Sequence, residues 1–169
     1  MKFSIVKQSV LIFSLLFLIA GCGKTDYKPA AINEKTDKCD VCHMAVKDDG
    51  FASEIILENE KTLKFDDIGC MYKWKSENKD EKIGNSFIKD YQTKKWLEVE
   101  KASFVYDKSI KTPMAYNVIA FGDKKAAQDF IDKNSGELLT ADDLGSHSWE
   151  RNKAMMEEMK KKMNMNMNH

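Results

Sequence analysis

The sequence predicts an α+β fold in which two similar small ββαβ units pack together, because one local pattern occurs twice. A strand, a phenylalanine, an aspartate and a helix follow one another in residues 62–74 and again in residues 116–130. The two phenylalanines, Phe65 and Phe121, are 56 residues apart and stand at the expected strand-to-helix corners. One such unit alone is too small to bury a sufficient core. The alternative is a single α+β sheet in which the likeness of the two segments is coincidental.

The N-terminus is typical of an export signal, which we place at residues 1–21. Two lysines precede an apolar run over residues 10–20, which is too short for a comfortable membrane span. The run ends in Leu-Ile-Ala-Gly-Cys, which resembles the bacterial lipobox and predicts cleavage before Cys22 and lipid on that cysteine. An uncleaved N-terminal anchor is the alternative. Either way, we expect the protein on a membrane, facing the periplasm or the cell exterior.

The net charge of the mature chain argues against nucleic acid as a partner. Removal of residues 1–21 takes away two lysines and leaves 25 basic and 27 acidic residues, a net charge of −2. The mature chain therefore has no strongly basic balance, and nucleic acid is not an expected partner.

The elements of the domain follow in order. Residues 22–38 are polar and predict a flexible tether, and residues 39–140 form the predicted domain. In the first unit we expect a hairpin from residues 51–57 and 62–65, then a helix capped by Asp66. In the second unit we expect a helix capped by Asp123. The other expected strands are residues 86–91, 96–99, 104–106, 116–121 and 137–140.

The C-terminal residues 141–169 are rich in methionine, lysine and glutamate. Residues 149–162 predict a helix, and six of the ten methionines of the chain lie in residues 155–167. This composition is typical of a solvated amphipathic helix with a frayed end. Thioethers are also soft metal ligands, so a Cu(I)-collecting tail is a second interpretation.

The residues Cys39-Asp-Val-Cys42-His43-Met44 carry the candidate chemistry. Two thiols, an imidazole and a thioether lie within six residues, and an odd number of cysteines follows Cys22. The same residues match the attachment motif of a c-type haem, for which Met114 or a tail methionine could supply an axial ligand. They also fit a dithiol oxidoreductase, which would make the protein an exported redox protein.

Zinc or copper could also be bound by these residues. Cys39, Cys42, Cys70 and a histidine would form a tetrahedral zinc site, although a second Cys-x-x-Cys pair is missing from the sequence. Cu(I) fits the donor set better, because thiolates and thioethers are its preferred ligands. The candidate Cu(I) ligands are Cys39, Cys42, Met44 and Met114, with His43 and Cys70 as possible additions.

Three motifs together resemble the NosL family of outward-facing lipoproteins. They are Cys39 to Met44, then Phe-Asp-Asp-Ile-Gly-Cys at residues 65–70, then Thr-Pro-Met at residues 112–114. The resemblance implies two ββαβ-like units, Cu(I) binding through Cys42, Met44 and Met114 with Cys39 as a further member, and no enzymatic activity. It also implies delivery of copper to nitrous oxide reductase or its ABC-type maturation complex. The family usually has glycine where this chain has His43, and the methionine-rich tail lies outside the family pattern.

Overall fold

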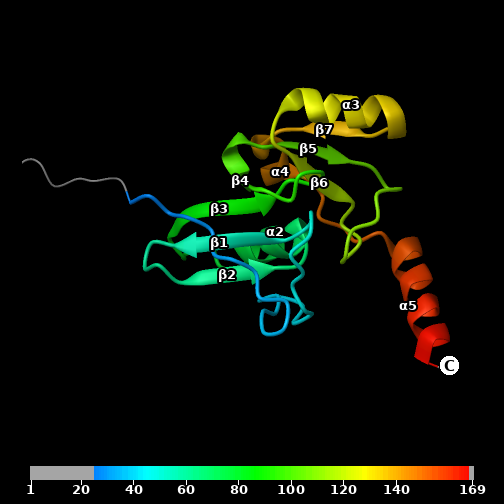
Figure 1. Cartoon of the computed structure of the whole chain (residues 1–169), viewed down its shortest axis with the longest axis horizontal. Helices are drawn as coiled ribbons and strands as arrows, with labels where there is room; N and C mark the ends of the chain where they lie inside the picture. Colours follow the sequence, from blue (N-terminus) through cyan, green and yellow to red (C-terminus); the bar gives the residue numbers. More distant parts are fainter. Residues whose placement is uncertain (1–24, 168–169) are drawn as a thin grey trace, which may run out of the picture.

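A computed structural model describes residues 25–167 of the chain (Figure 1). The fold is α+β with two antiparallel sheets, as the sequence predicted. The export signal and the lipidation site at Cys22 lie outside the described residues. Within residues 25–167 we find no helix that combines the length and the apolar character needed to cross a bilayer.

The first unit holds a four-stranded sheet with strand order β2-β1-β3-β4. Its elements are β1 (Ser53–Leu57), β2 (Thr62–Phe65), α2 (Ile68–Glu77), β3 (Ile83–Lys89) and β4 (Trp96–Glu98). Ile55 pairs with Leu63 across β1 and β2, and both side chains are buried in one core with Ile68 of α2. The apolar face of the sheet is therefore covered by the helix that follows β2.

The second unit repeats this arrangement with three strands in the order β6-β5-β7. After the short helix η2 (Val99–Lys101) come β5 (Ser103–Tyr106), β6 (Val118–Phe121), α3 (Lys124–Asn134) and β7 (Glu137–Leu139). The side chain of Asp123 accepts a hydrogen bond from the amide of Ala126, so the predicted helix cap is confirmed.

The two units are copies of one ββαβ motif, as predicted. The strands β6, β5 and β7 take the places of β2, β1 and β3 in the respective sheets. Ser53 pairs with Phe65 in the first unit, and Ser103 pairs with Phe121 in the second, so each corner phenylalanine has an equivalent partner. The units differ in the loop of the hairpin. Residues 58–61 form a short turn in the first unit, whereas residues 107–117 form a long loop in the second.

The second sheet lies between its own helix and the first unit. Val105, Ile119 and Phe121 form a core with α3. Phe104 and Val118 belong to the larger core, which also contains the buried residues of α2. The alternation of side chains along β5 and β6 thus serves both packing layers.

The segment before the first motif lies against the first sheet, on the face opposite α2 (Figure 1). The amide of Ala30 donates to the side chain of Glu54 in β1 at 2.9 Å. The ring of Tyr27 packs on Gly84, where a Cβ atom would meet it at 2.3 Å. Tyr27 and Ala30, expected as part of a flexible tether, therefore contact the first sheet instead, and the buried Glu54 supplies the acceptor for the amide of Ala30.

Two helices follow the second unit. The first, α4 (Ala141–Ser146), was not expected and begins with a capping box between Thr140 and Asp143. The second, α5 (Lys153–Met167), confirms the predicted helical tail, although it begins and ends a few residues later than expected.

Candidate metal centre

The first motif is a tight turn closing a short antiparallel pairing over residues 37–46. The amide of Cys39 donates to the carbonyl of Met44 at 2.8 Å, and the amide of His43 donates to the carbonyl of Cys39 at 3.0 Å. The amide of Cys42 lies 3.5 Å from the sulfur of Cys39. His43 has a φ of 62°, in the left-handed region that favours glycine. The turn therefore explains why glycine suits this position.

This turn is fixed beside the end of β2. The amide of Asp40 donates to the carbonyl of Lys64 at 2.9 Å, and the amide of Lys64 donates to the side chain of Asp40 at 2.8 Å. The ammonium group of Lys64 also forms an ion pair with Asp37. The turn is therefore anchored two residues before Asp66, at the corner between strand and helix.

The corner supplies the second motif. Asp67 is the N-cap of α2 and accepts a hydrogen bond from the amide of Gly69 at 3.0 Å. The helix then presents Cys70 in its first turn, where its side chain is buried. The sequence predicted Asp66 as the cap, but Asp67 takes that role and leaves Asp66 free to face the first motif.

Three cysteines and one aspartate converge at this corner. Ligand atoms of Cys39, Cys42, Asp66 and Cys70 all lie within 4.8 Å of one another. The thiol of Cys42 lies 3.3 Å from each carboxylate oxygen of Asp66 and donates to that group. All three cysteines are free thiols. These four residues are called the thiol cluster below.

The pKa values of the four residues in the thiol cluster are shifted in different directions. A hydrogen bond from Cys70 lowers the pKa of Cys39 to about 4, and the same bond, together with burial, raises the pKa of Cys70. Burial, followed by the charge of Asp66, raises the pKa of Cys42 to about 12. Burial, followed by the charge of Cys39, raises the pKa of Asp66 to about 6. The protons are therefore held unequally within the cluster, and a bound cation would displace those that remain on its thiols.

The third motif lies on the long hairpin loop of the second unit, residues 107–117. The buried side chain of Thr112 accepts hydrogen bonds from the amide of Tyr116 at 3.1 Å and from the amide of Asn117. The amide of Met114 donates to the carboxylate of Asp67 at 2.9 Å. Met114 is 8% exposed and belongs to the same buried cluster as Cys39 and Cys70. The loop thus brings the third motif to the helix start that carries the second.

Aromatic packing holds this loop on α2. A Cβ atom at Gly69 would lie 2.0 Å from the ring of Tyr116, so only glycine allows this approach. Trp149 stacks on Tyr72 of α2, with ring centroids 4.6 Å apart, and meets Tyr116 edge-on at 6.1 Å. The two units are therefore closely fitted at the candidate site.

One side of the thiol cluster adjoins a pocket of about 340 Å³. Met44 is 51% exposed and lines this pocket with Asp66 and Pro113. The side chain of His43 is exposed. The structure thus brings Cys39, Cys42 and Cys70 together, and places Met44 at their open side.

Asp66 was not predicted as a member of the cluster. Cys70 was predicted as a possible addition to the ligands, and its thiol lies in the cluster. The usable signal was spacing, because Asp66 and Cys70 are four residues apart around a helix start. The expected histidine of a zinc set is not in the thiol cluster.

The geometry disfavours both redox interpretations. Covalent haem needs both thiols of the motif to reach the porphyrin, but Cys39 is 0% exposed. A dithiol oxidoreductase needs an accessible thiolate. Here the more accessible thiol, Cys42, has the raised pKa, and the thiol with the lowered pKa, Cys39, is buried.

Comparisons with known proteins agree with this fold. The family model described as NosL matches residues 29–149. The chain is also similar to the crystal structure of the copper chaperone NosL from Shewanella denitrificans, with 19% sequence identity and a TM-score of 0.62. The match covers 70% of this chain and 96% of that chain. No curated protein sequence matches the chain.

Proposed function

The chain belongs to the NosL family, and from that premise we propose that it is a metallochaperone whose cargo is Cu(I). The thiol cluster is the observation that carries this proposal. Three thiols within 4.8 Å of one another are a soft donor set, which favours Cu(I) over hard cations. The proposed ligands are Cys39, Cys42, Met44 and Met114, with Cys70 and Asp66 completing the surroundings of the ion.

The accessibility of the donors suits transfer of the ion. Cys39 and Cys70 are buried, Cys42 is half-buried, and Met44 is exposed. A recipient protein can therefore approach Cys42 and Met44 first and exchange ligands while the buried sulfur atoms still hold the ion. An enzyme is not implied, because the chemistry needed is only ligand exchange and proton release.

The proposed location rests on the N-terminal sequence, and the proposed recipient rests on the resemblance to the NosL family. The export signal and the lipid proposed for Cys22 would place the protein on the outer face of a membrane. The proposed recipient is nitrous oxide reductase or its ABC-type maturation complex, or another exported cuproenzyme. The structural relative supports copper delivery as the general task, since that protein is described as a copper chaperone.

Anaerobic Cu(I) titration against a calibrated chelator tests the proposal. We expect the reduced protein to remain colourless and to bind one tightly held Cu(I). Cys42→Ser and Met114→Leu should each weaken binding by about tenfold or more. The matched control is Met71→Leu, which changes another buried methionine of the same core and should leave the affinity unchanged.

Two results would contradict the proposal. One is a protein with covalent haem and a Soret band after expression in a haem-maturing host. The other is tight Cu(I) binding that survives loss of Cys42, since the ion would then be held elsewhere.

A further inference from the structure

The methionine-rich helix α5 is fixed to the loop that carries Met114. The side chain of Arg151 donates to the carbonyl of Met114 at 2.7 Å, and the amide of Asn152 donates to the carbonyl of Ala115 at 2.8 Å. The side chain of Asn152 also donates to the carbonyl of Lys108 at 3.0 Å. Helix α5 therefore begins at the candidate metal centre, although its sequence lies outside the NosL match.

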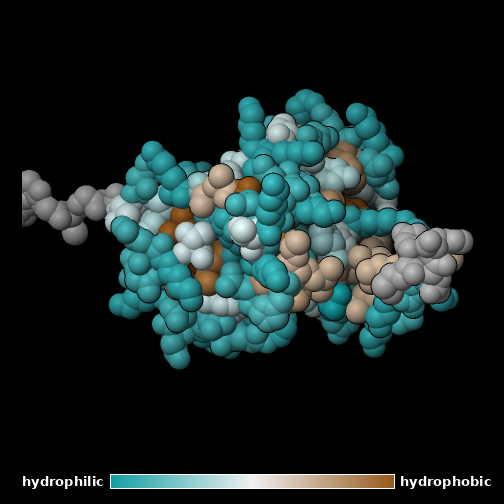
Figure 2. All heavy atoms as spheres, turned by 60° about the horizontal axis from the view of Figure 1, so that its bottom comes forward, coloured by the Kyte–Doolittle hydropathy of each residue, from teal (hydrophilic) through white to brown (hydrophobic). Residues whose placement is uncertain are grey.

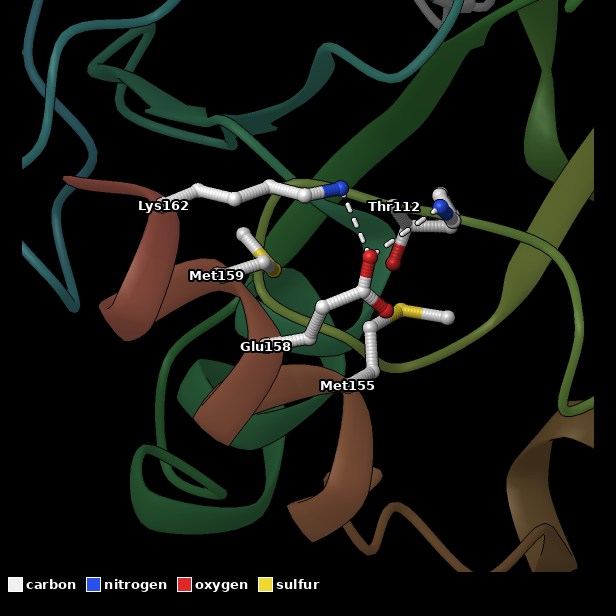
Figure 3. A pocket seen from close by; sticks show the side chains of 6 residues that line it. Thr112, Met155, Glu158, Met159 and Lys162 are labelled. Carbon is white, nitrogen blue, oxygen red and sulfur yellow. Dashed lines mark hydrogen bonds and ion pairs between the residues drawn. The ribbon is translucent and has the colours of Figure 1, made fainter. Parts of the chain in front are cut away.

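The first turns of α5 direct methionines toward this loop. Met155 is buried, and its sulfur accepts a hydrogen bond from the side chain of Asn117 at 3.5 Å. One turn later, Met159 is half-buried and lines a pocket of about 140 Å³ with Thr112 and Glu158 (Figure 3). Met159 also lines the pocket of about 340 Å³ beside the thiol cluster. It therefore lies between the two pockets.

Met159 and Met44 are the two thioethers that line the larger pocket. Met44 comes from the first motif, and Asp66 of the thiol cluster lines the same pocket. Two residues with thioether side chains, from distant parts of the chain, thus line one space next to the candidate metal centre.

The methionines continue outward along the helix. Met155, Met159 and Met163 follow at four-residue intervals and share one side of α5, since a helix turns about 100° per residue. Met163 is 54% exposed, so the row runs from a buried thioether to the solvent. Moderately hydrophobic surface lies between the body of the molecule and its C-terminal end (Figure 2). Met165 is also exposed, but it lies about 160° around the helix from Met163 and about 120° from Met159.

We propose that Met159 and Met163 form a second, thioether Cu(I) site at the mouth of the thiol cluster, with Met44 as the thioether that this site shares with the first. This inference rests on the proposed function and deepens it, because the site would pass the ion between solvent or partner and the thiol cluster. Thioethers are neutral, so the ion enters and leaves without proton transfer and stays Cu(I) throughout. Binding is weaker than at thiolates, which suits a transfer site.

Hydrophobic packing alone is the competing explanation, since methionines also fill gaps between helices. Replacement of these methionines by leucine distinguishes metal binding from hydrophobic packing. Leucine keeps the volume and the helix propensity of methionine but has no sulfur donor. The test variant is Met159→Leu/Met163→Leu in the chain without the export signal. The matched control is Met165→Leu, which removes an equally exposed thioether from the other side of α5.

Cu(I) titration with isotope-labelled methionine methyl groups observed by NMR is the first measurement. We expect the first equivalent to bind tightly in both variants as in the unmodified chain. A second, weaker equivalent should shift the methyl signal of Met159, whereas the signal of Met44, which both sites share, should shift with each equivalent. In the double variant the affinity for this second equivalent should fall by about tenfold or more, whereas the Met165→Leu variant should keep the affinity of the unmodified chain.

The second measurement is the rate of Cu(I) transfer from the loaded protein to a chelator. We expect slower transfer in the double variant at unchanged affinity for the first equivalent. Circular dichroism checks that α5 stays helical. Unchanged methyl signals of Met159 during titration, or transfer as fast as in the unmodified chain, would overturn the second site. Failure of the proposed function looks different, since the unmodified chain would then bind no Cu(I) at all.

Discussion

The amide of Met114 donates to the carboxylate of Asp67 at 2.9 Å, and this bond joins residues that are 47 positions apart. The same carboxylate caps α2 through the amide of Gly69. One buried side chain therefore both starts the helix of the first unit and holds the long loop of the second. The position of the third motif relative to the other two depends on it.

Asp67→Ala should cost more stability than the equivalent change in the second unit. Asp123→Ala removes an exposed N-cap, worth about 1 kcal/mol. Asp67→Ala removes an N-cap and also leaves the amide of Met114 buried without its acceptor, for a total of about 2–4 kcal/mol. Urea denaturation measures both values. Cu(I) affinity should fall only in the Asp67 variant, and equal losses of stability would contradict the double role of this carboxylate.

Gly69→Ala should displace the long loop of the second unit. The added methyl group would lie 2.0 Å from the ring of Tyr116, so the ring and the loop carrying Met114 must move. We expect a loss of about 2–3 kcal/mol and weaker Cu(I) binding. Gly145→Ala is the matched control in α4, where a Cβ atom meets nothing within 4 Å. This control should be neutral or stabilising; a neutral Gly69→Ala would show that the contact with Tyr116 is not rigid.

His43→Gly should stabilise the protein without weakening Cu(I) binding. The residue has a φ of 62°, and relief of this left-handed strain is worth about 0.5–1 kcal/mol after the greater chain entropy of glycine is included. Glu60→Gly, at a φ of 66° in the turn between β1 and β2, should give a similar gain. Chelator competition should show that Cys42→Ser costs more affinity than His43→Gly. The reverse order would make His43 a ligand.

Glu54→Gln should change how stability depends on pH. The side chain is 0% exposed, and burial raises its pKa above the ordinary value near 4.5. The folded state therefore keeps a proton that the unfolded state loses. Stability of the unmodified chain should decrease as the pH rises above about 4.5 and through the raised pKa, until Glu54 is ionised in both states.

Thermal denaturation between pH 4 and pH 8 measures this effect. Gln keeps an acceptor for the amide of Ala30 but carries no charge, so the variant should gain stability relative to the unmodified chain as the pH rises. Glu58→Gln, which changes an exposed carboxylate in the adjacent turn, is the control. An identical pH dependence in the Glu54 variant would mean that Lys64 already compensates the buried charge.

The strands and the helices of the two units could be predicted because their signals are local. A short apolar-rich run marked β1, the segment after the turn marked β2, and aspartates after Phe65 and Phe121 marked both helix starts. The contacts made by backbone groups could not be predicted. Ala30 docks through its amide and α5 docks on the carbonyls of Met114 and Ala115, and neither contact leaves a pattern in the sequence.

Only some residues of the candidate metal centre could likewise be predicted from the sequence. Soft donors can be recognised as residue types, so Cys39, Cys42, Met44 and Met114 were predicted as ligands from their chemistry together with the resemblance to the NosL family. Cys70 was considered as an addition. The place of Asp66 depends on which of two adjacent aspartates caps α2, which is decided by the Met114 amide from the other unit. Met159 reaches the larger pocket only because Arg151 and Asn152 fix the start of α5.

The contact of Tyr27 with Gly84 limits how far the domain could stand from a bilayer. If Cys22 carries the lipid, the anchor lies five positions before Tyr27, the first side chain that packs on the domain in the described part of the chain. At about 3.5 Å per residue, the segment between Cys22 and Tyr27 can span at most roughly 18 Å. The domain would thus work close to the lipid headgroups, and its client would need to present its copper-receiving surface near the membrane.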